Sequence, residues 1–119
     1  MRAEDYEAFV RRTDMYVRDQ GDAPYALGLA SEAGEAADLV KKALRQGAFA
    51  KPLVGDLEHQ FLLELGDVLW YVTRLAQRHG ASLSQIMDLN VNKLATRYEK
   101  TPEGRALMAR KLIEETTGG

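Results

Sequence analysis

The chain has 119 residues, with 16 basic and 18 acidic side chains and a formal net charge of −2. This length predicts one ordinary domain, and a hydrophobic share of 45% is enough for a folded core. The near balance of charge argues against a protein devoted to long nucleic acids, which would carry a basic excess. The absence of cysteine excludes a disulfide framework, a thiolate zinc site and a cysteine nucleophile.

The hydropathy of the chain predicts its cellular compartment. No apolar run approaches the ~20 residues that a membrane-spanning helix needs. The start, Met1–Asp5, becomes acidic at once and is unlike a signal peptide. We therefore expect a cytoplasmic protein with no membrane partner.

Apolar residues recur at three- and four-residue intervals, which is the spacing of amphipathic helices. The pattern predicts helices over residues 4–19, 22–47, 56–80 and 82–98. Asp22 is the expected N-cap of the second helix, with Pro24 in its first turn and Gly47 at its end. A last, weaker helix is expected from Thr101 toward Glu115, and residues 47–55 should form the longest internal loop.

The fold class follows from these elements. No segment shows the strict alternation of a strand, and the chain has no internal repeat. We predict an all-α fold, a bundle of four principal helices with a short C-terminal helix. Residues 1–115 are expected to form a single domain, and residues 116–119 a flexible tail.

Four acids lie at or beside the apolar faces of the second and third predicted helices, where charged side chains are rare. They form two i, i+3 pairs, Glu32 with Glu35 and Glu64 with Asp67. Burying several carboxylates is prohibitive without compensating positive charge. Ordinary ion pairs with Lys or Arg remain one explanation, but two such pairs on adjacent helices favour a bound metal.

The residue types indicate which metal such a site would take. Carboxylate-bridged redox bundles use a Glu-x-x-His step, and neither His59 nor His79 has that spacing to the acids. An all-oxygen site favours Mg²⁺, with Mn²⁺ as the alternative, and these ions recruit substrate phosphates as further ligands. The four acids therefore predict phosphate chemistry.

The fourth predicted helix carries Asn90, Lys93 and Arg97 near its apolar face. In one interpretation, Lys93 and Arg97 neutralise the acids in structural ion pairs or extend outward into solvent. In the other, they bind the phosphate oxygens that the metal leaves free. Lys42, on the same side of its helix as Glu35, is a weaker candidate for phosphate binding.

Two aromatic residues, Trp70 and Tyr71, follow the second acidic pair. An aromatic face near a phosphate site can stack on a base, although such residues more often lie in a core or an interface. Trp70, off the main apolar stripe, also suits an oligomer contact. Phe9, Tyr25 and Phe49 are further candidates for a base pocket.

Three segments resemble the signature of the MazG-like nucleotide pyrophosphohydrolases, which belong to the all-α NTP pyrophosphatase superfamily. They carry Glu-x-x-Glu at 32–35, Glu-x-x-Asp at 64–67 and Asn-x-x-Lys-Leu-x-x-Arg at 90–97. The resemblance covers roughly residues 25–98. It implies Mg²⁺-dependent hydrolysis of a (deoxy)nucleoside triphosphate to the monophosphate and pyrophosphate, by attack of water at the α-phosphate.

The resemblance also implies roles for the residues. Glu32, Glu35, Glu64 and Asp67 would be the catalytic and metal-binding residues, with Glu32 or Glu35 taking the proton of the attacking water. Asn90, Lys93 and Arg97 would contact the phosphates, and the chain would form a homodimer or homotetramer. The alternative function is a non-catalytic helical dimerisation module, in which the acids and bases form structural ion pairs and no activity depends on metal.

Overall fold

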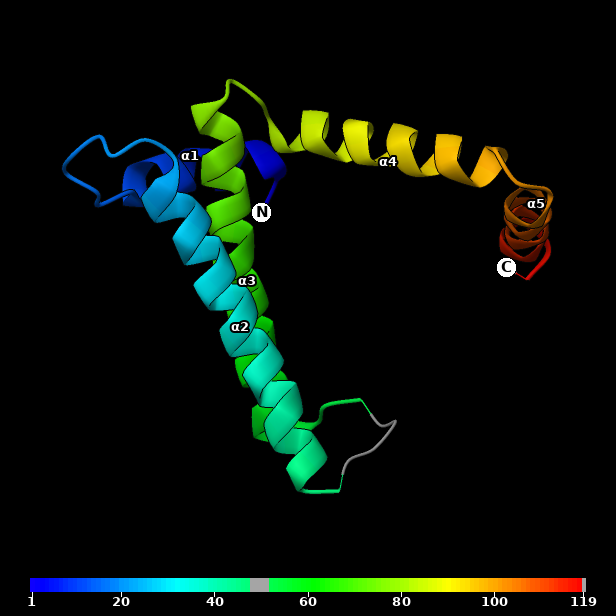
Figure 1. Cartoon of the computed structure of the whole chain (residues 1–119), viewed down its shortest axis with the longest axis horizontal. Coiled ribbons are helices and arrows are strands. Elements are labelled where there is room, and N and C mark those ends of the chain that lie inside the picture. Colours follow the sequence, from blue (N-terminus) through cyan, green and yellow to red (C-terminus); the bar gives the residue numbers. More distant parts are fainter. Residues whose placement is uncertain (48–51, 119) are drawn as a thin grey trace. The chain divides into compact units, whose positions relative to one another are not determined.

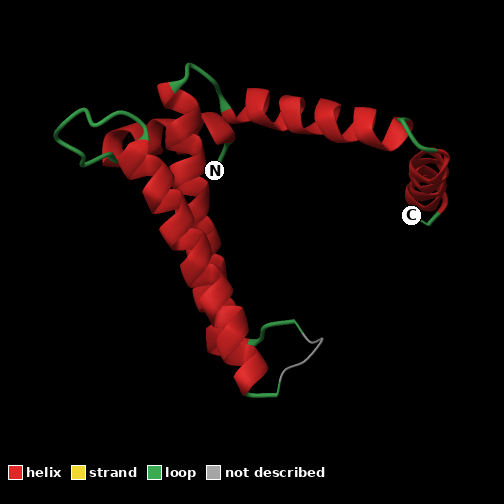
Figure 2. Ribbon diagram, viewed as in Figure 1, coloured by secondary structure: helices red, strands yellow, loops and turns green. Residues whose placement is uncertain are grey.

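The computed structural model describes residues 1–47 and 52–118, and these segments form helices with no strand (Figure 1). In chain order the helices are α1 (Ala3–Thr13), α2 (Ala23–Arg45), α3 (Gly55–Arg78), α4 (Leu83–Glu99) and α5 (Pro102–Thr117). The prediction of an all-α fold is confirmed (Figure 2). Within the described segments, no helix is both long enough and apolar enough to cross a bilayer.

Helices α2 and α3 begin and end close to the predicted residues. Pro24 lies in the first turn of α2, as expected. Gly47 and Gly80 follow α2 and α3 with φ angles of 81° and 71°. Because only glycine adopts this left-handed geometry without steric cost, these two residues stop the helices where the sequence predicts.

Asp22 occupies the N-cap position of α2, as predicted, but the expected capping bond is absent. Its side chain makes no capping hydrogen bond to the helix. The carboxylate instead lies 2.9 Å from Nε of Arg78 and 2.6 Å from Nε2 of His79. The charge at residue 22 therefore ties the start of α2 to the end of α3.

Helix α1 ends at Thr13, well before the predicted end at residue 19. The Thr13 hydroxyl donates to the carbonyl of Phe9 at 2.9 Å, and Asp14 leaves helical geometry with ψ at 108°. The Asp14 carboxylate accepts the backbone N–H of Tyr16 at 3.0 Å, a local bond that competes with continuation of the helix. Residues 14–22, which we call the strap, thus join α1 to α2 outside any helix.

Helix α5 lies where the last helix was predicted, and it extends two residues beyond Glu115, to Thr117. With 16 residues it is longer than α1, which has 11. Its start is as expected, because the Thr101 side chain accepts the N–H of Gly104 at 2.9 Å.

The chain divides into two compact units, Met1–Leu83 and the residues from Ser84 onward. In the first unit, α1 and α2 both pack against α3, and α2 and α3 run side by side in opposite directions (Figure 1). The buried side chains of these two helices include Ala36, Leu39, Ala43, Thr73 and Ala76. The second unit, with α4 and α5, is described by itself, so a single four-helix bundle and a single domain stay predictions.

Candidate functional site

Three of the four predicted acids come together on α2 and α3. Glu32 and Glu35 lie one turn apart on α2, and Glu64 lies on α3. Each offers one carboxylate oxygen, and these three atoms all lie within 4.8 Å of one another. Glu32 and Glu64 are half-buried, whereas Glu35 is exposed. The packing of α2 against α3 thus creates the carboxylate cluster.

The cluster fits a hard divalent cation. Among the described residues, Oε2 of Glu32 and Oε2 of Glu64 are buried and have no hydrogen-bond partner. Burial and the neighbouring carboxylates of Glu64 and Glu35 raise the pKa of Glu32 to about 7. Buried carboxylate oxygens without a protein donor are costly, and they are the ligands that Mg²⁺ and Mn²⁺ prefer.

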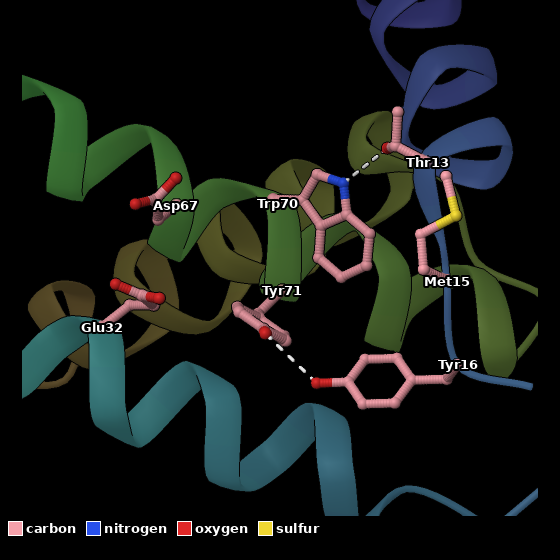
Figure 3. Close-up of a pocket in the computed structure, with 7 residues that line it drawn as sticks. All are labelled: Thr13, Met15, Tyr16, Glu32, Asp67, Trp70 and Tyr71. Atoms are coloured by element: carbon pink, nitrogen blue, oxygen red, sulfur yellow. Dashed lines mark hydrogen bonds between the residues drawn. The ribbon is translucent and has the colours of Figure 1, made fainter.

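A pocket of about 470 Å³ opens beside the cluster (Figure 3). Its acidic end carries Glu32 from α2 and Asp67 from α3. Asp67 is exposed and lines this pocket without being one of the three clustered acids. The other end is built by α1, the strap and α3, and its lining side chains are Thr13, Met15, Tyr16, Trp70 and Tyr71.

Trp70 and Tyr71 both reach this pocket, and neighbouring side chains fix them there (Figure 3). Nε1 of Trp70 donates to the Thr13 hydroxyl at 2.8 Å, and the Tyr71 hydroxyl lies 3.3 Å from that of Tyr16. The two rings meet edge to face, with centroids 5.0 Å apart. Trp70 therefore makes contacts within the chain, although its position on the helix alone suggested a contact between subunits.

Gly28 of α2 allows the Tyr71 ring to lie on the helix backbone. A Cβ at residue 28 would overlap ring atoms Cε1 and Cζ of Tyr71. Gly28 lies one turn before Glu32, on the same face of α2. Because Gly28 has no side chain, Tyr71 of α3 can approach α2 closely next to the carboxylate cluster.

We expect Gly28→Ala to lower the free energy of unfolding by about 1–3 kcal/mol, because the Tyr71 ring must leave its place. Gly34→Ala is the matched control on the same helix, since no atom lies within 4 Å of a Cβ there. Alanine's better helix propensity should make that control neutral or more stable by up to ~1 kcal/mol. Urea denaturation of the two variants measures the difference, and equal stabilities would contradict the close approach of Tyr71.

Two of the other aromatic candidates, Tyr25 and Phe9, lie away from this pocket. Tyr25 is buried behind the strap, where its hydroxyl donates to Asp14 at 2.6 Å. Phe9 lies exposed on α1 with its ring near that of Tyr6. Neither residue belongs to the described lining of this pocket. Phe49 lies outside the described residues.

The predicted phosphate ligands are exposed side chains of α2 and α4. Lys42 lies on α2, and its Nζ is 3.4 Å from Oδ2 of Asp38. Asn90, Lys93 and Arg97 lie on α4. Lys93 and Arg97 line a pocket of about 520 Å³ within the second unit, together with Asn92, Thr96 and Lys100. These residues and the acids belong to different units of the chain, so the approach of Asn90, Lys93 and Arg97 to the acids stays a prediction.

Sequence reasoning missed the residues that the strap and the end of α1 bring to the pocket, namely Thr13, Met15 and Tyr16. It placed all three in one long helix. The available signal is the pair Thr13–Asp14, since both side chains can bond to the nearby backbone and so favour a helix end.

Comparison with known proteins gives a further line of evidence, from sequence similarity. Residues 20–101, more than half of the chain, match the family described as "MazG nucleotide pyrophosphohydrolase domain". A curated relative, "Gene 37 protein" of Mycobacterium phage L5, is 42% identical over 76 residues, which cover 62% of this chain and 63% of the relative. The match thus spans less than two thirds of that relative's length. No solved structure matches the chain significantly.

Proposed function

This chain belongs to the MazG nucleotide pyrophosphohydrolase family, and on that basis we propose that it hydrolyses (deoxy)nucleoside triphosphates to monophosphates and pyrophosphate with Mg²⁺. The observation that carries the proposal is the cluster of Glu32, Glu35 and Glu64, in which two buried carboxylate oxygens lack a donor. A divalent cation satisfies those oxygens and is also what a triphosphate needs for binding. Mn²⁺ is the alternative cation.

The acids have distinct parts in this proposal. Glu32, Glu35, Glu64 and Asp67 would hold the cation, which when bound supplies positive charge for the phosphate oxygens and makes water easier to deprotonate. Glu32 or Glu35 accepts the proton of the water that attacks the α-phosphate. Oxygens of both glutamates lie within 4.8 Å of an oxygen of Glu64, so either carboxylate would lie beside a cation held there.

The remaining roles concern the substrate. Asn90, Lys93 and Arg97, and more weakly Lys42, would bind phosphate oxygens through charge-assisted hydrogen bonds. Trp70 and Tyr71 would bind the base, and their place in the pocket next to Glu32 supports this role.

The test is a product analysis of the purified protein with each canonical nucleoside and deoxynucleoside triphosphate. We expect monophosphate and pyrophosphate in Mg²⁺ and no turnover after chelation. In heavy-oxygen water the label should enter the monophosphate, because water attacks the α-phosphate. Release of inorganic phosphate and a diphosphate, or label in the pyrophosphate, would contradict the proposed reaction.

We also propose that the chain works as a homodimer or homotetramer. Several large apolar side chains of α2 and α3 lie exposed, including Leu27, Leu62 and Leu63 at 70%, 56% and 58%. Apolar surface on two neighbouring helices is typical of a face that a partner covers. Sedimentation should give at least twice the 13.3 kDa of one chain, and a particle with the mass of one chain would contradict this proposal.

The same exposed surface favours one alternative, a non-catalytic helical dimerisation module. Such a module would sediment as an oligomer but turn over no nucleotide. Its melting temperature would also not change with Mg²⁺ and a non-hydrolysable nucleotide, because only a ligand that binds the native state raises stability.

A further inference from the structure

Charged side chains hold the strap against α3 at both of its ends. At its start, the Asp14 carboxylate accepts Nε of Arg74 at 2.7 Å. At its end, Asp22 pairs with Arg78 and His79. The two strap residues that line the pocket, Met15 and Tyr16, come directly after Asp14 and so lie next to the end that Arg74 holds.

Asp14 is the residue through which Tyr16 is held. Its Oδ1 accepts the backbone N–H of Tyr16 at 3.0 Å, and its Oδ2 accepts the hydroxyl of Tyr25 at 2.6 Å. The Tyr25 ring meets the Tyr16 ring edge to face, with centroids 4.9 Å apart. The Tyr16 hydroxyl in turn lies 3.3 Å from that of Tyr71. One carboxylate thus fixes the backbone of Tyr16 directly and its ring through Tyr25.

The ionisation state of Asp14 agrees with this role. Its side chain is only 8% exposed. Burial acts to raise its pKa, but hydrogen bonds from Tyr25, Arg74 and the Tyr16 amide outweigh burial and lower it. Asp14 is therefore ionised at neutral pH and accepts all three bonds at once.

The two ends of the pocket suit the two ends of a nucleotide. Glu32 and Asp67 stand at one end, where a cation and phosphates would be held (Figure 3). The rings of Trp70, Tyr71 and Tyr16 stand at the other end, and aromatic faces bind flat heterocycles by stacking (Figure 3).

We propose that Asp14 is a positioning residue that sets nucleoside affinity, by holding Tyr16 beside Trp70 and Tyr71 at the aromatic end of this pocket, the nucleoside subsite of the proposed function. The proposal rests on the proposed function, because the acidic end would hold the phosphates. Asp14 itself touches no part of the substrate. Its effect on the substrate passes through Tyr16.

The chain contains a direct reporter, since Trp70 is its one tryptophan and lines the pocket. The full-length protein in Mg²⁺ is titrated with each deoxynucleoside 5′-monophosphate while Trp70 fluorescence is followed. Tripolyphosphate, which has no base, is measured in parallel by calorimetry. We expect the nucleotides to change the fluorescence of the wild-type protein.

Two variants test the role of the strap. Asp14→Asn and Tyr16→Ala should each raise the Kd for the nucleotides about tenfold, or about 1.4 kcal/mol, with a far smaller change for tripolyphosphate. Tyr16→Ala leaves the pair of Asp14 and Arg74 intact. It therefore tests the contribution of the Tyr16 side chain to the pocket even if Asp14→Asn folds poorly. Asp5→Asn is the control, because Asp5 is an exposed acid of α1 whose carboxylate lies 3.8 Å from Nε of Arg2, which is also exposed.

The outcomes separate this inference from the proposed function. The inference is overturned if both variants weaken the binding of nucleotides and tripolyphosphate equally, or if a folded Asp14→Asn protein binds the nucleotides as tightly as the wild type does. If no triphosphate is turned over but the nucleotide Kd changes as expected, the subsite stands and the proposed function fails. If triphosphates are turned over without that selective change, the proposed function stands and the subsite fails. In an active protein, KM for nucleoside triphosphates should rise in Tyr16→Ala much more than kcat falls.

Discussion

Replacing Glu64 with glutamine should reduce triphosphate hydrolysis on the order of 10²–10³-fold, the scale expected when one group that stabilises the transition state is lost. The substitution keeps the size of the side chain and removes its charge. Oε2 of Glu64 is buried without a partner, and a carboxylate oxygen of Glu64 lies within 4.8 Å of those of Glu32 and Glu35. A neutral amide at this position binds a divalent cation far less well than a carboxylate does.

The fold should survive this change. Without metal, Glu64→Gln should melt at the wild-type temperature or above it, because removing one charge relieves repulsion among the clustered acids. Glu58→Gln is the matched control, since Glu58 is an exposed acid of the same helix. Steady-state rates and thermal melting of both variants provide the measurement. A Glu64→Gln protein with the wild-type rate would show that the carboxylate cluster is not the active site.

Replacing Arg74 with methionine should lower the free energy of unfolding by about 3 kcal/mol, the lower end of the cost of leaving a buried charge without its partner. Asp14 is 8% exposed and Arg74 is 22% exposed, so water cannot fully replace the guanidinium. The lower end applies because Tyr25 and the Tyr16 amide still donate to the carboxylate. Chemical denaturation measures the loss.

Arg78→Met is the control for this prediction. Arg78 lies one turn further along α3, but its partners Asp19 and Asp22 are 84% and 44% exposed. Exposed ion pairs contribute about 0–1 kcal/mol, and the guanidinium of Arg78 also lies 4.8 Å from the centre of the Tyr25 ring, a contact worth about 0.5–1 kcal/mol. This variant should therefore lose less stability than Arg74→Met. In a double-mutant cycle, Asp14→Asn should recover part of what Arg74→Met loses. Equal losses for the two arginine variants would contradict the special role of the Asp14 pair.

The same pair gives a defined pH dependence. Because the folded protein lowers the pKa of Asp14 below its ordinary value of 3.8, the ionised carboxylate stabilises the fold above that pH. This contribution is lost as the pH falls through the lowered pKa of the folded state. In Arg74→Met the pKa of Asp14 should rise, so acid denaturation should begin at a higher pH than in the wild type.

The sequence was sufficient for the long helices and for the face that carries the acids. Helices α2 and α3 combine an apolar period with glycine stops, and these signals act within a few residues of each other. The i, i+3 spacing alone places Glu32 beside Glu35, whatever α2 packs against. That Glu64 meets them follows from the packing of one apolar stripe on another, which the same period predicts.

The aromatic half of the pocket could not be predicted in this way. Its two defining contacts, Tyr16 with Tyr71 and Thr13 with Trp70, join residues that lie 55 and 57 positions apart. The apolar period of α1 also continues falsely into the strap, where Val17 is 95% exposed. Asp14, which ends α1 through its local bond to the Tyr16 amide, also finds a partner in Arg74 of α3, and a pattern within α1 carries no information about that partner.

The two ends of the strap differ in how they respond to salt. Asp19 and Asp22 meet Arg78 and His79 in water, where counter-ions screen the attraction over about 8–10 Å at physiological ionic strength. The Asp14 end is shielded from the same ions because its carboxylate is buried. Rising salt should therefore loosen the strap at residues 19–22 first, so that amide hydrogens there exchange faster while Tyr16 keeps its place. The pocket-lining part of the strap therefore depends on the salt-resistant pair of Asp14 with Arg74, and not on the salt-sensitive pairs of Asp22.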